Sequence, residues 1–532
     1  MIFINYLKQI LNISFSLLKL NNIFQLIKKM KTKSFLILSL LCYYLAFSQE
    51  KPNIIWVFSD DHSYQTIGAY GGRLQNLNPT PNLDKLASEG MIFNKCYVEN
   101  SICAPSRATL LTGKMSHLNG KFTNSKKHPF DHNQQQFQKI LQKNGYQTAM
   151  IGKIHLRGNM QGFDYWEVLL GQGSYVDPVL LSDKGRKEYK GYTTNIITDK
   201  SLDWLENKRD KNKPFMMMLH HKAPHRPWVP DSAHINMYEN VEIPEPINLF
   251  DNYNTRTTAA HRQKMSILKH MNMHIDLKMT KADEKASLKV PKEIDNRFDK
   301  RREKFKDLNL KDKELLRLKY QIYMKDYLRC IWSLDKNIGR ILTYLKKTGL
   351  DKNTIIMYSS DQGFYMGEHG WFDKRFMYEE SFRTPLIVKW PGKTKAGSVN
   401  SDLVQNIDFA ETFLEIAGAP IPEDMQGKSL VPILKGKTPK DWRKSLYYHY
   451  YEYPGAHSVR RHEGIANKRF KLIRFYGKDV PNGEEWEFYN LKKDPSEMNN
   501  LYLKLKNSNK ISKMKKELLK LKELYKIEKP LP

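Results

Sequence analysis

The sequence predicts an α/β protein. A large domain would have a central mixed, mainly parallel sheet flanked by helices, and a smaller C-terminal antiparallel sheet with a helix would follow it. Three observations predict this: five short apolar runs typical of buried strands, helical patterns between them, and a change of pattern near residue 436. At 532 residues, 40% of them hydrophobic, the chain is long enough for one large domain and a smaller one.

The predicted strands of the large domain end at polar or charged residues. They are Asn53–Ser59, Ala149–Gly152, Phe215–His220, Thr354–Ser359 and Leu386–Trp390. The clearest helix is marked by apolar residues spaced three and four apart: Tyr327, Ile331, Leu334, Ile338, Leu342 and Leu345. Because open α/β sheets bind ligands beyond the strand ends, the residues that follow these strands are candidates for a functional site.

Three segments are predicted along the chain. Residues 1–48 are an export leader, with basic Met30–Lys33, apolar Ser34–Leu45 and small residues for a signal peptidase at Ala46 and Ser48. Met30 is favoured as the true start; the alternative is that residues 1–29 form an amphipathic or membrane-anchoring leader. Residues 49–435 form the main domain, with a charged helical insertion at about 251–320, and residues 436–532 form a C-terminal subdomain.

The C-terminal subdomain is predicted from aromatic runs and a terminal helix. Antiparallel strands are expected around Tyr447–Tyr451, Phe470–Phe475 and Glu487–Tyr489. Leu and Lys repeat at helical spacing over Ile511–Ile527, which favours an amphipathic helix packed on that small sheet over one bound to a membrane.

Composition limits the partners. The net charge of +30 suggests an anionic partner, and we take it as modest support for a polyanionic substrate. No Arg/Lys patch interleaved with aromatics and no nucleic-acid-binding motif is seen, so nucleic acid is not expected. The leader predicts an exported protein, periplasmic or secreted, and the apolar run is too short for stable membrane insertion. Without the leader three cysteines remain, Cys96, Cys103 and Cys330, which is no disulfide framework.

Cys103 opens the most informative motif. Cys103–Arg107 has the pattern C-x-P-S-R and is followed by Leu110, Leu111, Thr112 and Gly113. Taken alone, the motif also fits a turn with a buried cysteine that leads into a helix, since free cysteine usually behaves as a small hydrophobe.

Carboxylates follow two of the predicted strands. Asp60 and Asp61 come after the first strand, and Asp361 and Gln362 come after the fourth. Oxygen ligands suit a hard cation, and calcium is favoured over zinc because no Cys/His cluster accompanies them. Each pair by itself would more often be structural.

Basic residues lie at corresponding positions after the strands. Lys153 and His155 can face one pocket from an extended segment, and His225 is held between Pro224 and Pro227. Lys374 follows the Asp361 loop. The structural alternatives are a surface pair for the first two and a solvated side chain for Lys374.

Together these residues resemble the formylglycine-dependent type I sulfatases of the alkaline-phosphatase-like superfamily, from about Lys51 to the end of the chain. Beside the Cys103 motif, the resemblance rests on Pro52–Ile55, Pro79–Asp84, Gly152–His155, Ala223–His225, Ser360–Gly363 and Glu487–Leu491. The one departure is Gln362, where many members have Asn; both offer an amide oxygen.

The resemblance implies a mechanism and its residues. Residues 49–435 would be the catalytic domain. A maturation enzyme would convert Cys103 to 3-oxoalanine (formylglycine), whose hydrate attacks the sulfate ester. Calcium would be held by Asp60, Asp61, Asp361, Gln362 and the modified Cys103. Arg107 would orient the hydrate, Lys153 and Lys374 would bind sulfate oxygens, His225 would be the acid and His155 the base.

The substrate is less defined. The resemblance favours a sulfated polysaccharide or its oligosaccharides, for which an algal polymer such as ulvan or carrageenan is the main expectation. The alternative is a glycosaminoglycan N-acetylglucosamine-6-sulfatase, which the segment His220–His225 resembles. Further alternatives are a phosphodiesterase of the same superfold, which usually holds two zinc ions, and a non-catalytic polyanion-binding protein.

Overall fold

The computed structural model describes residues 51–281 and 290–527, so the predicted leader lies outside the described residues. From Pro52 onward the chain forms one compact unit. Among the described residues, no helix combines the length and the apolar character that a membrane crossing requires.

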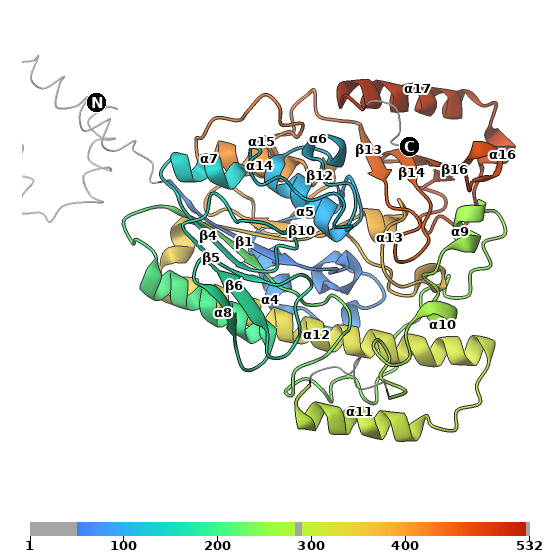
Figure 1. The fold of residues 1–532 in the computed structure, drawn as a ribbon. Coiled ribbons are helices and arrows are strands. Elements are labelled where there is room, and N and C mark those ends of the chain that lie inside the picture. Colours follow the sequence, from blue (N-terminus) through green and yellow to red (C-terminus); the bar gives the residue numbers. More distant parts are fainter. Residues whose placement is uncertain (1–50, 282–289, 528–532) are drawn as a thin grey trace, which may run out of the picture. The chain divides into compact units, whose positions relative to one another are not determined.

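A ten-stranded mixed sheet forms the centre of this unit, as the sequence predicted (Figure 1). Its order is β11-β2-β10-β9-β1-β8-β4-β5-β6-β7. The strands β9, β1, β8, β4 and β5 run parallel, whereas β10, β6 and β7 are antiparallel to their neighbours. The bounds are β1 Asn53–Ser59, β2 Met91–Phe93, β4 Gln147–Gly152, β5 Tyr165–Leu169, β6 Val179–Ser182, β7 Gly185–Glu188, β8 Phe215–His220, β9 Thr354–Ser360, β10 Leu386–Lys389 and β11 Ser398–Asn400.

Helices cover both faces of the sheet because both faces of its central strands are apolar. In β1, Ile55 and Val57 join the core on one face, whereas Ile54, Trp56 and Phe58 join the core on the other. The first core packs against α4 (Pro81–Glu89), α8 (Thr193–Asp203) and α12 (Asp312–Thr348), and the second against α5 (Cys103–Thr112), α7 (Phe137–Lys143) and α14 (Asp408–Ile416).

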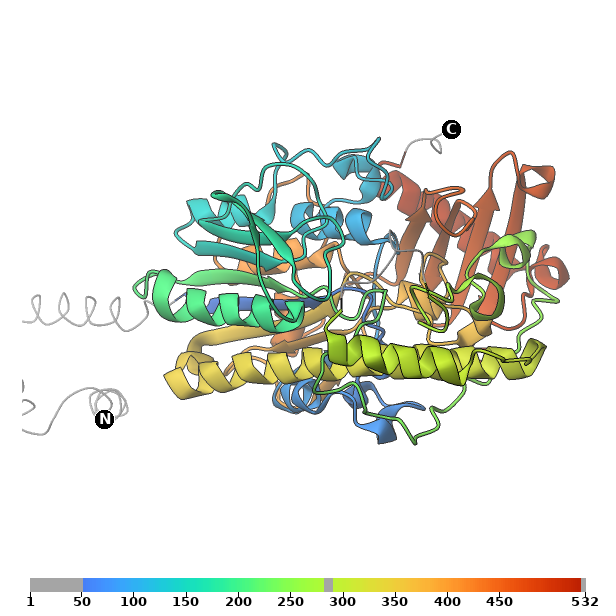
Figure 2. The same ribbon diagram turned by 60° about the horizontal axis from the view of Figure 1, so that its bottom comes forward.

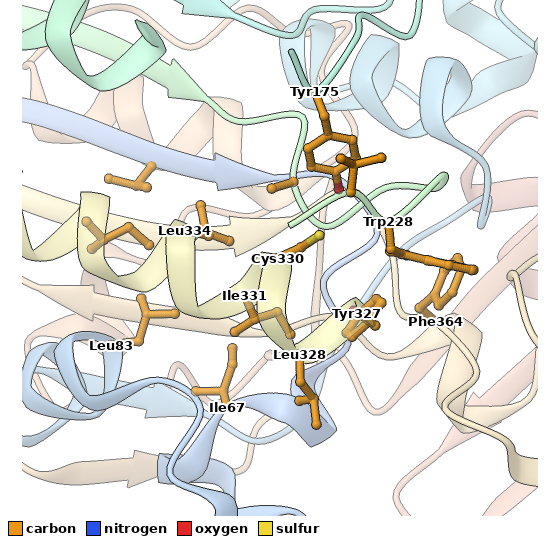
Figure 3. Packing of buried hydrophobic residues seen from close by; sticks show 14 of the residues in the cluster. Ile67, Leu83, Tyr175, Trp228, Tyr327, Leu328, Cys330, Ile331, Leu334 and Phe364 are labelled. Carbon is orange, nitrogen blue, oxygen red and sulfur yellow. The ribbon is translucent and has the colours of Figure 1, made fainter. Parts of the chain in front are cut away.

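The long helix α12 is central to the first core. Its buried residues include the predicted Tyr327, Ile331 and Leu334, which Figure 3 shows among side chains from α4, the loop after β1 and the loop after β8. Because residues three and four apart share one helix face, this stripe packs on the sheet side. The helix ends at Gly349, whose φ of 74° suits a left-handed cap.

The C-terminal part is a separate four-stranded antiparallel sheet with a helix across it, which confirms the predicted fold class (Figure 1). Its strands are β13 Ser445–Tyr450, β14 His462–Asn467, β15 Phe470–Tyr476 and β16 Glu484–Asn490, and the helix α17 (Asn509–Leu524) packs on it through Ile511, Met514 and Leu518. The shorter elements of the chain are β3 Cys96–Tyr97, β12 Val404–Gln405, α6 Ser116–Asn119, α13 Glu379–Phe382, α15 Val431–Leu434 and α16 Tyr502–Leu505.

The charged interval from 251 to 320 contains short helices and the start of a long one. They are α9 Thr258–Arg262, α10 Ile267–His270, α11 Lys292–Lys304 and the first turns of α12. Helix α11 lies along α12 in both views (Figures 1 and 2). The boundaries of the insertion and of the C-terminal subdomain remain predictions.

Candidate active site

The candidate site lies where four parallel strands end. Ser59 pairs with Ser360, Phe58 with His220, and Gly152 with His220, so the carboxyl ends of β1, β9, β8 and β4 lie side by side. The predicted site residues follow these strands. The sheet thereby brings together side chains that are up to 313 positions apart in the sequence, as in the contact of Lys374 with Asp61.

Cys103 approaches this edge from the start of α5. The helix begins at Cys103 and ends before Gly113, whose φ of 65° gives a left-handed cap, which explains the Leu-Thr-Gly part of the motif. Cys103 is 1% exposed, and its Sγ lies 3.1 Å from Lys374 Nζ. Burial raises the pKa of Cys103 to about 12, so at neutral pH the unmodified side chain is a thiol and a weak nucleophile.

The remaining polar residues of the motif tie α5 to the strand ends. Ser106 Oγ donates to the backbone oxygen of Asp361 at 2.5 Å. Arg107 donates two bonds to Asp361 Oδ2, at 3.1 and 3.2 Å, and one to the backbone oxygen of Lys153 at 2.6 Å. Burial would raise the pKa of Asp361, but Arg107 and Lys374 hold it below the usual value. Arg107 therefore fixes α5, the Asp361 carboxylate and the end of β4 in one arrangement.

The oxygen atoms at the strand ends fit a cation. One ligand atom each from Asp60, Asp61, Cys103 and Asp361 lies within 4.8 Å of the others, and all four residues are buried. Asp60 Oδ1, Asp61 Oδ2 and Gln362 Oε1 are buried without a hydrogen-bond partner. Unpartnered buried oxygens are costly, and an all-oxygen set suits calcium. The residues present therefore fit the predicted calcium site.

Two lysines bind the same carboxylates. Lys153 Nζ contacts Asp60 Oδ2 and Gln172 Oε1, and Lys374 Nζ contacts Asp61 Oδ1. Burial lowers the pKa of Lys374, but Asp61 and Cys103 raise it by more, so the net shift is upward. Burial and then Lys222 lower the pKa of Lys153 well below its usual value, and its contact with Asp60 opposes this by favouring the charged form. Both lysines are almost fully buried, and their amino groups lie where an anionic group can be bound.

The two predicted histidines line the same edge with different partners. In His225, Nδ1 lies 2.6 Å from the Arg226 backbone oxygen, and Nε2 lies 3.7 Å from Asp61 Oδ2, beyond hydrogen-bond distance. Since a carbonyl only accepts, Nδ1 carries the proton and Nε2 is directed at the site. His155 has a φ of 56°, and its buried Nδ1 has no partner. Burial and then Lys153 lower the pKa of both rings well below the usual value.

Two residues of the site were not predicted. Gln172, in the Gly171–Gly173 turn, accepts a bond from Lys153. Lys222, three residues before His225, is 2% exposed, and its Nζ lies 4.9 Å from the Tyr175 ring centroid. Burial lowers the pKa of Lys222 to about 8. The place of Lys222 just beyond the β8 end is the feature of the sequence that indicates it.

The charges of the site balance before any ligand binds. The balance is that of the direct ion pairs, in which three carboxylates are opposed by Arg107, Lys153 and Lys374; Lys222, outside these pairs, adds positive charge. A bound divalent cation would leave the site net positive, which favours an anionic substrate.

Comparison with known proteins supports the resemblance to sulfatases over most of the chain. A family model described as sulfatase matches residues 52–419, and one described as the C-terminal part of N-sulphoglucosamine sulphohydrolase matches residues 367–524. An N-acetylglucosamine-6-O-sulfatase of Bacteroides thetaiotaomicron is 49% identical over 493 residues, 89% of this chain and 86% of that protein. An ulvan-active sulfatase of Formosa agariphila is 25% identical, over 85% of this chain and 77% of that protein.

A solved structure shares this fold closely. It is that of a protein in complex with its substrate D-glucosamine-2-N,6-O-disulfate, with a TM-score of 0.86 and 48% sequence identity. The match covers 90% of this chain and 99% of the other.

Proposed function

We propose that this chain, which belongs to the sulfatase family and is a sulfuric ester hydrolase, removes the 6-O-sulfate from glucosamine residues of a glycosaminoglycan. The main support for this substrate is the 49% identity, over 89% of the chain, with an N-acetylglucosamine-6-O-sulfatase. The ulvan-active relative is only 25% identical. The alternative raised by the sequence, a glycosaminoglycan N-acetylglucosamine-6-sulfatase, is therefore better supported than the main expectation of an algal polymer such as ulvan or carrageenan.

The proposed chemistry begins at Cys103. If Cys103 is converted to formylglycine, the hydrate of its aldehyde would supply an oxygen nucleophile. The unmodified thiol is a weak nucleophile at neutral pH because it stays protonated. Asp60, Asp61, Asp361 and Gln362 would hold calcium, which offsets negative charge on the sulfate. Lys374 lies within bonding distance of the Cys103 side chain, so its ammonium group can bind a sulfate oxygen beside the nucleophile. Lys153 would bind another, and Arg107 fixes α5 on Asp361.

The histidines supply proton transfer. His225 holds its ring through Nδ1, so Nε2 faces the site. In its imidazolium form, protonated at both nitrogens, His225 would deliver the Nε2 proton to the leaving oxygen of the sugar and return to the neutral ring. His155 is proposed as the base for the hydrate, because its ring lies in a cationic environment that keeps it neutral.

The proposed enzyme is exported and needs a modification of Cys103 before it is active. We propose an exported enzyme, periplasmic or secreted, on the basis of the sequence of residues 30–48. A formylglycine-generating enzyme would act on Cys103 before the chain folds, since the folded site buries this residue.

The test is sulfate release from matched substrates by matured, calcium-loaded protein. We expect release from N-acetylglucosamine-6-sulfate and from 6-O-sulfated glycosaminoglycan oligosaccharides, with kcat/KM at least about tenfold above ulvan and carrageenan oligosaccharides. Cys103→Ala should release no sulfate from any of them. Faster turnover of the algal oligosaccharides would contradict the proposed substrate.

A phosphate diester belongs in the same panel. The groups of potential metal ligands among the described residues both contain Asp60 and Cys103, so they form one metal site where a two-zinc phosphodiesterase needs two. Hydrolysis of the diester at a rate above that of the sulfate ester would favour that alternative.

A further inference from the structure

A cleft of about 220 Å³ lies between α11 and α12, outside the candidate active site. The two helices lie side by side in both views (Figures 1 and 2). Six of the residues that line the cleft are cationic, and we call it the basic cleft: Arg297, Lys300, Arg301, Lys304, Lys325 and Arg329.

The spacing of these cations places them on facing helix surfaces. On α11 the four cations occupy positions i, i+3, i+4 and i+7, and on α12 the two occupy i and i+4, spacings that keep side chains on one helix face. Elsewhere on α11, positive charge is balanced, since Arg302 pairs with Asp295 and Asp299. The excess of positive charge on α11 is therefore concentrated on the face toward α12.

Carboxylates compensate this charge only in part. Glu239 lines the cleft and pairs with Arg297 and Arg329. Asp326 lies beneath it, fully buried, and binds Arg301 and Arg329. No acidic residue in the described ranges, 51–281 and 290–527, forms an ion pair with the three lysines of the cleft. Like charges at this spacing are destabilising, and a bound anion would relieve that cost.

The pKa of one cleft lysine reflects this environment. Burial lowers the pKa of Lys325, and the nearby Arg329, Lys304 and Arg301 lower it further, against the opposing effect of Glu239. The cleft around Lys325 therefore carries a positive potential.

The basic cleft and the active site lie on opposite sides of one turn of α12. Lys325 and Arg329 face the cleft. Tyr327, two residues from each and so about 200° around the helix, donates from its hydroxyl to the backbone oxygen of Asp61 at 2.6 Å. Helix α12, about 10–12 Å across with its side chains, therefore lies between the two regions, and a chain that reaches both would pass around it.

We propose that the basic cleft is a second binding site for an anionic oligosaccharide, and that it holds sulfate or carboxylate groups of the chain whose end is hydrolysed at the active site. This inference rests on the proposed function. Proteins that bind single-stranded nucleic acid combine a basic groove with aromatic rings on which bases stack. Here the one aromatic residue among those lining the cleft is Phe305, and Lys304 Nζ lies 5.5 Å from its ring centroid.

The test compares two triple variants of the full, matured chain. K300A/K304A/K325A removes the three lysines of the cleft and leaves its arginines, which bind Asp326 and Glu239, in place. The control K513A/K516A/K520A removes the same charge from exposed positions of α17. Binding of a heparin-derived octasaccharide is measured by calorimetry, and sulfate release is measured on glucosamine-6-sulfate.

The cleft variant should bind the octasaccharide about tenfold more weakly, because three partly exposed charge pairs each change affinity a few-fold. The control should change affinity less than about threefold. Turnover of the monosaccharide should stay at the wild-type value in both. Unchanged octasaccharide binding in the cleft variant, or an equal loss in both variants, would overturn the inference.

Two further arms keep the outcome specific. A 20-nucleotide single-stranded DNA and vesicles of phosphatidylglycerol are titrated in parallel, and a larger loss for either of them than for the octasaccharide would reject a glycan site. In wild-type protein, the octasaccharide should protect Lys300, Lys304 and Lys325 from acetylation, and an absence of protection would also reject it. If wild-type protein binds the octasaccharide through the cleft yet releases no sulfate from the monosaccharide, the proposed function is wrong and the proposed glycan-binding site is still supported.

Discussion

At the residue scale, burial makes each contact of the site necessary. Asp61 is 0% exposed. Its carboxylate accepts hydrogen bonds from Lys374 and Gln362, and its backbone N–H donates to Asp361 Oδ1. Burial raises the pKa of Asp61, and Lys374 is the main group that lowers it again. A buried carboxylate without a counter-charge is costly. The same lysine thus stabilises the folded site and presents an ammonium group beside Cys103.

Replacing Lys374 should separate these two roles. We expect Lys374→Ala to lower kcat by about 10²–10³-fold, because one donor to the developing charge is lost, and to lower the free energy of unfolding by about 3–5 kcal/mol, because Asp61 loses its partner. Lys395→Ala, which removes an exposed lysine, should change neither quantity. Steady-state kinetics and urea denaturation measure the two effects; full activity in Lys374→Ala would contradict the assigned role.

At the element scale, close packing of strand ends sets the geometry of the site. Gly152 ends β4 with a φ of 107°, and a Cβ there would collide with the backbone oxygen of His220 on β8. Only glycine allows this approach, and Lys153 follows at once and donates its N–H to the same oxygen at 2.8 Å. The position of Lys153 therefore depends on the absence of a side chain at residue 152.

A pair of glycine substitutions tests this dependence. Gly145→Ala also imposes a side chain at positive φ, 85°, but meets nothing within 4 Å, so it should cost about 1 kcal/mol of unfolding free energy. Gly152→Ala adds the collision and should cost at least about 2 kcal/mol more, with kcat reduced as Lys153 is displaced. Equal unfolding midpoints for the two variants would show that the approach of β4 to β8 is not tight.

The elements that could be predicted are those whose burial is visible as an apolar run. The strands β1 and β8 occur with the predicted bounds, because both of their faces are apolar. The strand β14 was not predicted, since His462, Glu463 and Gly464 have no strand-like pattern and are buried only by the sheet on either side. Gln172 and Lys222 were also missed, because only the folded chain brings them to the site. The basic cleft was missed for the same reason, since it forms where α11 packs beside α12.

At the scale of the whole molecule, the cation and the fold should stabilise each other. The carboxylates of the proposed calcium site follow β1 and β9, and α5 is held on the same carboxylates by Arg107. A ligand that binds only the folded state raises the free energy of unfolding by an amount set by its concentration relative to its Kd. Binding of the ion should therefore stabilise the ends of β1 and β9 and helix α5 together.

Removal of the cation should lower stability and activity together. Treatment with EGTA should lower the thermal midpoint, by several degrees if the ion is bound at about a hundred times its Kd, and should abolish sulfate release. Calcium should restore both, and zinc should not, since the ligands are oxygen atoms. The matched variant Gln362→Leu should need more calcium for the same midpoint. An unchanged midpoint after chelation would contradict a calcium site here.

The most direct test of the account is the chemical state of residue 103. The protein is produced in a host that contains a formylglycine-generating enzyme, and the peptide that contains Cys103 is examined by tandem mass spectrometry with and without a hydrazide label. The account predicts an aldehyde at residue 103 that takes the label, in proportion to the specific activity of each preparation. An unmodified thiol at this position in a fully active preparation would contradict it.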